Sequence, residues 1–242
     1  MNRLRHVAAA FTLFVSGCGF LDPSPPSDAE LGRGLIIMYP GALNTTFEML
    51  GFYAGMRAAG VQQAIEIKPW APPLLNFVIP RDFVEYERPW AREEARRIAQ
   101  YQRDYPGRPV TLLGYSGGAM VCILVAEELP AGHAIDRVIM MSPGVSTTYD
   151  LEPMLANTAG NAIVYWSPLD TVVNFATSLL GTLDGFFGPS AATLGFANNN
   201  PKLQQVQFGP QFAVFGNEGE HTDYAFSIEW ISQFVAPWIA RG

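Results

Sequence analysis

The sequence is poor in the residues that build metal and disulfide sites. Its 242 residues include only two cysteines and three histidines, too few for a dense Cys/His cluster, so we predict no metal site. Neither G-x-x-x-x-G-K-[ST] nor G-x-G-x-x-G occurs in the chain, so nucleotide binding has no support and we expect no cofactor. Charged residues make up 15% of the chain and the net charge is −7. This acidic balance argues against a nucleic-acid partner.

The chain is instead rich in apolar residues. They make up 49% of the sequence, which suits one α/β domain with a sizeable core. Short apolar runs predict strands at 34–39, 64–68, 109–113, 135–141, 162–166 and 203–208, and more weakly at 212–215. Apolar periodicity predicts helices at 47–59, 88–105, 119–128 and 228–239. We interpret the charges of 88–105, which include Glu93, Glu94, Arg96 and Arg97, as a solvated face.

The most informative stretch is Gly-Tyr-Ser-Gly-Gly at residues 114–118, between a predicted buried strand and a predicted helix. A serine at the tip of a strand–turn–helix is the G-x-S-x-G nucleophile elbow. Gly114 and Gly118 let strand and helix pack closely, while Ser116 takes a strained backbone conformation. Its hydroxyl then projects from the sheet edge, and the N–H of Gly117 faces an oxyanion near the helix N-terminus.

In these residues the sequence resembles the α/β-hydrolase family. The resemblance covers residue 34 to the C-terminus and implies a three-layer fold, with a mostly parallel central sheet and helices on both faces. Roughly twenty residues separate the strands predicted at 135–141 and 162–166, too few for the helical cap that many family members carry there. We therefore expect no large cap domain.

A serine hydroxyl needs an adjacent base that is oriented by a third group, and in this family the order is Ser, acid, His. Asp170, in the turn after the strand at 162–166, resembles the family's acid loop. Asp150, after the preceding strand, is the alternative acid. His221 stands between the last strands and the closing helix, where the family places its base. His6 falls in a signal-like segment, and His133 precedes a strand at the opposite end of the sheet.

The family resemblance also indicates where the second oxyanion donor lies. It is carried by the loop after the first strand, here Pro-Gly-Ala-Leu-Asn at 40–44. By position the backbone N–H of Ala42 is the donor, with Leu43 as its neighbour. The familiar His-Gly form is absent, and Pro40-Gly41 takes its place.

Two apolar segments leave their role open. Residues 69–82 follow a strand and carry Trp70, Leu74, Leu75, Phe77 and Val78, which either line an acyl pocket or fold back onto the core. Residues 174–201, rich in Gly, Phe, Leu and Ala, form either a small lid or a connecting helix.

The N-terminus has the layout of a secretory signal, with a short basic stretch before a small apolar run. It ends in Val-Ser-Gly-Cys at 15–18, which resembles a bacterial lipoprotein signal cleaved before Cys18. The resemblance implies a lipidated Cys18 that anchors an exported protein in the cell envelope, on its periplasmic or outer face. The alternative is an ordinary signal peptide with an incidental cysteine. We expect a signal peptide at 1–17, an extended Pro/Ser-rich tether at 18–32 and the hydrolase domain at 33–242.

Together these residues predict a lipid-anchored serine hydrolase, of the carboxylesterase or lipase type, that acts on carboxylic or lipid esters. Ser116 is the expected nucleophile, His221 the base and Asp170 its orienting acid, with Gly117 and Ala42 at the oxyanion. Thioesterase, peptidase and acyltransferase chemistry use the same triad, because the fold does not fix the chemistry. A non-catalytic, lipid-anchored binding module with the same fold is the alternative from another class.

Overall fold

The computed structural model describes residues 24–71 and 83–240. Within these ranges, six strands form one parallel sheet in the order β2-β1-β3-β4-β5-β6. The strands are β1 (Leu35–Tyr39), β2 (Ala64–Ile67), β3 (Val110–Tyr115), β4 (Arg137–Met141), β5 (Ala162–Trp166) and β6 (Leu203–Gln207). Each lies within about two residues of a strand predicted from the sequence.

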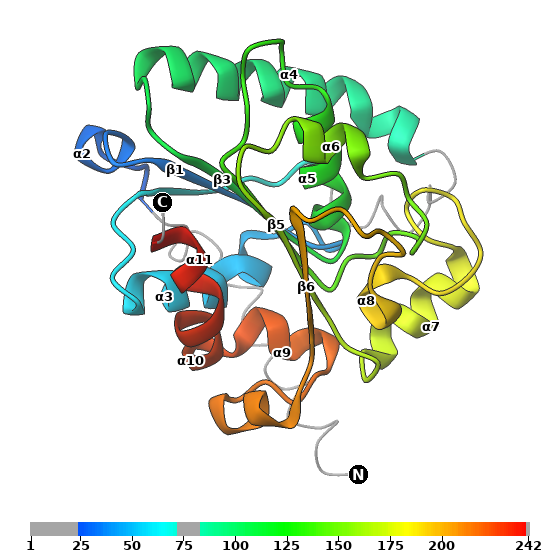
Figure 1. Ribbon diagram of the computed structural model, residues 1–242. Helices are drawn as coiled ribbons and strands as arrows, with labels where there is room; N and C mark the ends of the chain where they lie inside the picture. The colour runs from blue at the N-terminus through cyan, green and yellow to red at the C-terminus, as the bar shows by residue number, and fades with distance from the viewer. Residues whose placement is uncertain (1–23, 72–82, 241–242) are drawn as a thin grey trace.

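The helices cover both faces of this sheet (Figure 1). The α-helices are α2 (Asp28–Leu31), α3 (Leu50–Ala58), α4 (Phe83–Asp104), α5 (Gly117–Glu127), α6 (Glu152–Ala156), α7 (Thr171–Leu180), α8 (Ala191–Leu194), α9 (His221–Phe226), α10 (Ile228–Trp230) and α11 (Ala236–Ala240). Two 3-10 turns, η1 (Thr46–Met49) and η3 (Pro210–Phe215), and a π-helical segment, η4 (Ile231–Val235), complete the described elements.

The three layers follow from the apolar runs of the strands. Because successive side chains point to opposite faces, each inner strand supplies two cores and reads as a continuous apolar run. Leu35, Ile37 and Tyr39 of β1 face α4, α5 and α6, whereas Ile36 and Met38 face α3 and the C-terminal helices. The predicted three-layer α/β architecture is therefore confirmed.

Helix α4 differs from the prediction in its start and in its charged face. It begins at Phe83, before the predicted residue 88, and includes Pro89 near its start. Glu94 is buried, not solvated. It pairs with Arg97 at 2.8 Å and with Lys68 of the segment after β2, and it accepts a hydrogen bond from Tyr39. Partners on β1 and directly after β2, which lie far away in sequence, therefore surround part of the charge run.

Three other segments also differ from the sequence predictions. Residues 210–215 form the 3-10 turn η3 in place of the weakly predicted strand, with Pro210 at its start, where a missing N–H is tolerated. The closing helix of 228–239 is divided among α10, η4 and α11. Within the expected tether, Asp28–Leu31 forms the single turn α2, because Ser27 and Glu30 cap each other.

The connections at the carboxyl ends of the strands determine what surrounds a site there. Between β4 and β5 the only described helix is the five-residue α6. Residues 171–194 carry α7 and α8, which lie together at one end of the sheet in Figure 1. No helix within the described ranges is long and apolar enough to cross a bilayer.

Candidate active site

Ser116 stands between the end of β3 and the first residue of α5, as the elbow motif predicts. Its backbone is strained, with φ 54° and ψ −114°, a conformation that non-glycine residues rarely adopt. A Cβ on Gly118 would lie 2.1 Å from the carbonyl oxygen of Tyr39, and one on Gly114 would lie 2.2 Å from that of Gly118. Strand and helix can therefore approach this closely only because both positions lack a side chain.

Asp170 and His221, 51 residues apart in sequence, are in direct contact. Oδ2 of Asp170 lies 2.8 Å from Nδ1 of His221. Asp170 is fully buried at the start of α7, where its Oδ1 accepts the N–H of Val173 at 3.0 Å. His221 is 8% exposed and is the first residue of α9. The helix cap thus fixes the carboxylate, and the carboxylate in turn fixes the imidazole.

Ser142 is a third member of this cluster that the sequence did not single out. It directly follows β4, is fully buried, and has a φ of 49°. Its hydroxyl donates to Oδ2 of Asp170, and its Oγ lies 3.1 Å from Nδ1 of His221. The Nδ1–H of His221 therefore points at both Asp170 and Ser142. The one signal in the sequence that could have found Ser142 is its place directly after β4, the strand next to the elbow strand β3.

Tyr115, the residue before Ser116, joins the elbow to the cluster of Asp170, His221 and Ser142. The ring of Tyr115 stacks on that of His221, with centroids 4.8 Å apart, and its hydroxyl donates to the carbonyl of His221 at 3.1 Å. Since Nδ1 is engaged, Nε2 is the imidazole nitrogen that can serve Ser116. Within 24–71 and 83–240, no hydrogen bond joins the Ser116 hydroxyl to His221. Such contacts are often long without substrate and tighten when it binds.

The two expected oxyanion donors also lie close together. A Cβ built on Gly117 would lie 3.6 Å from the nitrogen of Ala42, 3.5 Å from the indole of Trp70 and 3.4 Å from Leu183. The nitrogen of Ala42, in the first loop, therefore lies next to Gly117 of the elbow. Trp70 from the first apolar segment and Leu183 from the second lie beside Gly117 as well.

The other candidate residues lie elsewhere. Asp150 is exposed, and its carboxylate accepts the N–H of Glu152. His133 contacts Gln102 at 2.8 Å. Burial raises the pKa of the Cys122 thiol well above its usual value, which disfavours the reactive thiolate. Cys18 and the apolar residues Leu74, Leu75, Phe77 and Val78 lie outside the described residues. Among the described residues, no group of three or more His, Cys, Asp or Glu side chains could hold a metal ion.

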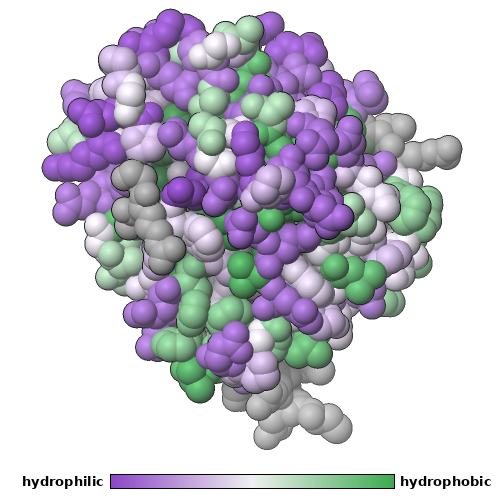
Figure 2. Space-filling view, in the orientation of Figure 1, coloured by the Kyte–Doolittle hydropathy of each residue, from purple (hydrophilic) through white to green (hydrophobic). Residues whose placement is uncertain are grey.

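Large apolar side chains are exposed on the segment that carries Leu183. Phe175 is 70% exposed, Leu179 65% and Phe187 68%. Figure 2 shows hydrophilic residues covering the top of the molecule, over α4, while hydrophobic ones gather toward the right and lower sides. Phe186, Val172 and Leu194 belong to the same segment and are also exposed. Asp184 is the single charged residue of 171–194.

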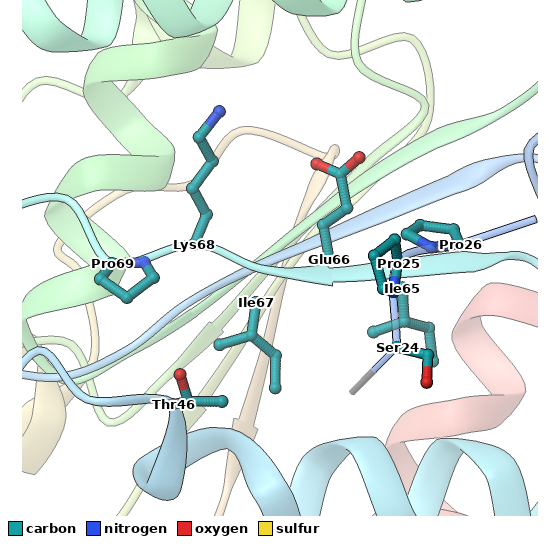
Figure 3. Close-up of a pocket in the computed structure, with 9 residues that line it drawn as sticks. All are labelled: Ser24, Pro25, Pro26, Thr46, Ile65, Glu66, Ile67, Lys68 and Pro69. Carbon is teal, nitrogen blue, oxygen red and sulfur yellow. The ribbon is translucent and has the colours of Figure 1, made fainter. Parts of the chain in front are cut away.

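A separate hollow lies at the edge strand β2 (Figure 3). Residues 24–26 border it on one side and Thr46 on the other, and Glu66 and Lys68 point away from Ile67 across the strand. Ser116, Asp170 and His221 are not among the described residues that line it. It is therefore distinct from the triad cluster.

Comparisons with known proteins agree with this architecture. Esterase PE8 superposes with a TM-score of 0.50 at 16% identity, over 91% of this chain and 99% of that chain. The fold is that of the α/β-hydrolases. The esterase domain of a Rhodothermus marinus protein is similar to this α/β-hydrolase fold with a TM-score of 0.49, at 14% identity over 88% of this chain and 90% of that one.

Similarity at the sequence level is more local. A stretch of 64 residues, 25% of this chain, is 36% identical to human monoglyceride lipase. The match spans 21% of the length of that lipase. No protein-family model matches the chain.

Proposed function

We propose that the protein is a serine hydrolase that cleaves carboxylic esters through an acyl-enzyme intermediate. The observation that carries the proposal is the buried Asp170–His221 contact beside a serine with a strained backbone. An activated serine needs a base and a group that orients the base, and it needs its hydroxyl presented at a sharp turn. The esterases and the lipase among the similar proteins support the same chemistry.

In the proposed acylation step, Oγ of Ser116 attacks the ester carbonyl carbon while Nε2 of His221 takes the hydroxyl proton. The carbonyl oxygen becomes an oxyanion, to which Gly117 and Ala42 donate their backbone N–H groups. Asp170 stabilises the imidazolium that forms and keeps Nδ1–H directed at itself. When the tetrahedral intermediate collapses, the ester C–O bond breaks and the imidazolium protonates the leaving alcohol.

Deacylation reverses these roles. Water attacks the acyl carbonyl while His221 takes a proton from it, and a second oxyanion forms between the same two N–H groups. The bond to Oγ of Ser116 then breaks, and the imidazolium returns the proton to the serine. The carboxylic acid leaves, and the enzyme is regenerated without a cofactor.

The apolar side chains near the elbow favour an ester with an acyl chain. Trp70 and Leu183 lie beside Gly117, and the exposed Phe175, Leu179 and Phe187 belong to the same segment as Leu183. Apolar surface of this kind binds alkyl groups through the hydrophobic effect, at about 0.8 kcal/mol for each buried CH₂. Lipid esters are therefore the proposed natural substrates, and activity should rise with acyl chain length over the first few carbons.

Membrane anchoring is the second part of the proposal. The sequence Val-Ser-Gly-Cys at 15–18 supports lipidation of Cys18, which would hold the exported domain at the cell envelope. Membrane partition of the full chain compared with Cys18→Ala tests this part. Equal partition of the two proteins would refute it.

Hydrolysis of a short p-nitrophenyl ester tests the activity itself. We expect turnover by the wild type and a fall in kcat of roughly 10⁴ to 10⁶-fold in both Ser116→Ala and His221→Ala. Turnover by the wild type no higher than that of Ser116→Ala would favour the non-catalytic binding module. Thioesters and peptide substrates in the same assay separate esterase from thioesterase and peptidase chemistry.

A further inference from the structure

Glu48 is a buried acidic residue that the catalytic steps above do not use. It lies in η1, directly after the loop that carries Ala42, and is 7% exposed. A carboxylate that loses its contact with water needs hydrogen-bond donors to replace it. The identity of those donors indicates what Glu48 does.

The donors are backbone N–H groups of the loop that carries Ala42. The N–H of Thr45 lies 3.1 Å from Oε2 of Glu48 and donates to this carboxylate, and the backbone N–H of Leu43 also lowers the pKa of Glu48. The loop turns at Gly41, whose carbonyl accepts the N–H of Asn44 at 2.9 Å. Ala42, the residue after Gly41, is the member of the pair whose nitrogen lies beside Gly117.

Glu48 also lies close to the candidate nucleophile. A Cβ built on Gly41 would lie 2.6 Å from Oε1 of Glu48 and 3.2 Å from Cβ of Ser116. Gly41 is therefore in close contact with both the carboxylate of Glu48 and the elbow. A side chain at this position would push the loop away from one of them.

The packing of α3 against α9 brings Glu48 toward His221 as well. A Cβ on Gly51 would lie 2.0 Å from the carbonyl oxygen of Ala225, so the two helices are in backbone contact. Glu48 lies one turn before Gly51, and His221 lies one turn before Ala225. Burial raises the pKa of Glu48, while hydrogen bonds from the loop and the charge of His221 oppose this rise.

The opposite side of the loop is held by Trp70 and Asn44. The indole N–H of Trp70 donates to the carbonyl of Pro40 at 2.9 Å, and the backbone N–H of Trp70 donates to Oδ1 of Asn44 at 3.0 Å. Trp70, in the segment after β2, therefore holds the loop through Pro40 and Asn44. Glu48, in η1, contacts the loop through Thr45.

We propose that Glu48 is a positioning residue of the oxyanion site: by accepting the N–H of Thr45 and lying against Gly41, it keeps the N–H of Ala42 aimed at the substrate oxyanion. This inference rests on the proposed function. It predicts that losing the carboxylate weakens stabilisation of the transition state more than substrate binding. Removing one oxyanion donor lowers kcat by about 10²–10³-fold in enzymes of this type.

The test compares an ordinary ester with its thionoester, in which sulfur replaces the carbonyl oxygen. Sulfur accepts hydrogen bonds poorly, so a thionoester gains less from the oxyanion donors than the ester does. The ratio of kcat/KM for the ester to kcat/KM for the thionoester therefore reports on these donors. We expect Glu48→Ala to lower this ratio by at least about tenfold, with KM for the ester within about threefold of wild type. Glu48→Gln should recover much of the ratio, because its amide oxygen still accepts backbone N–H groups.

The matched control is Glu87→Gln, which changes another buried glutamate, on α4. It should leave the ratio unchanged. If Glu48→Ala does not fold, Glu48→Asp replaces it, since its shorter side chain withdraws the carboxylate from the loop. The ratio should then be lower in Glu48→Asp than in Glu48→Gln.

A ratio equal to wild type in Glu48→Ala, or the reverse order of the Asp and Gln variants, would overturn the proposal while leaving the esterase assignment intact. Absence of hydrolysis by the wild type would instead refute the proposed function, and the role of Glu48 with it.

Discussion

The ring of Tyr115 lies nearly parallel to the imidazole of His221, with centroids 4.8 Å apart and an interplanar angle of 25°. Tyr115 immediately precedes Ser116, so the elbow itself supports the candidate base. Its hydroxyl also donates to the carbonyl of His221, which ties β3 to the first turn of α9. Tyr115 therefore links the position of Ser116, which follows it, to the position of His221, on which it stacks.

Replacing Tyr115 with Phe keeps the stacked ring and removes the hydrogen bond to His221. We expect the free energy of unfolding to fall by about 1 kcal/mol and kcat to fall by less than about tenfold, because the ring still orients the imidazole. Thermal unfolding and ester hydrolysis measure the two effects. A loss of kcat as large as that of His221→Ala would mean that the hydroxyl, and not the ring, supports the base.

Replacing Ser142 with Ala removes the hydroxyl that Asp170 and His221 share. A hydrogen bond to a charged group contributes about 1.5–3 kcal/mol, so we expect kcat/KM to fall by about ten- to a hundredfold. The control is Ser178→Ala, since the hydroxyl of Ser178 is exposed and donates only within α7, to Asn174. Equal rates in Ser142→Ala and Ser178→Ala would exclude Ser142 from the site.

Adding a methyl group at Gly118 tests the close packing at the elbow. The new Cβ would lie 2.1 Å from the carbonyl oxygen of Tyr39, so backbone has to move. We expect Gly118→Ala to lower the free energy of unfolding by about 3 kcal/mol or more, or to prevent folding. Gly144→Ala is the control, because nothing lies within 4 Å of its added Cβ. Denaturant unfolding measures the free energy of unfolding of both variants. Equal stability of the two would contradict the close contact between Gly118 and the carbonyl oxygen of Tyr39.

Glu87 predicts a pH dependence of stability. Burial raises the pKa of its carboxyl group from 4.5 to about 7. Between these two values the folded chain holds a proton that the unfolded chain has lost, so the free energy of unfolding falls as the pH rises. Glu87→Gln removes this contribution and should be more stable than wild type at pH 8 by up to about 3 kcal/mol, with the difference vanishing near pH 4. A constant difference across denaturant curves at pH 4, 6 and 8 would contradict the raised pKa.

The strand pattern and the elbow could be predicted from the sequence because their signals are local. Residues 109–118 contain the apolar run, the serine and both glycines that the turn requires. The extra length of α4 and the turn at 210–215 were missed because tertiary packing overrides local propensity there. Glu94 was misjudged for the same reason, since its partner Lys68 is distant in sequence.

In the candidate site, the residues with a motif or a fixed place in chain order were the ones that could be named. Asp170 and His221 were predicted by their order after Ser116, and the structure brings the two into contact. Ser142 belongs to no recognisable pattern, and its contact with Asp170 exists only in the folded chain. Glu48 stands three residues after Thr45, the spacing of a capping box, which indicates a helix start but not the nearness of its carboxylate to Gly41 and the elbow.

Reaction with a fluorophosphonate tests the proposed triad, because the probe labels only a serine that a neighbouring base activates. The folded protein is treated with the probe, its intact mass is measured, and the adduct is mapped. We expect one stoichiometric adduct on Ser116 of the wild type and none on His221→Ala. A folded wild-type protein without an adduct, or with one on another residue, would contradict the triad and favour the binding module.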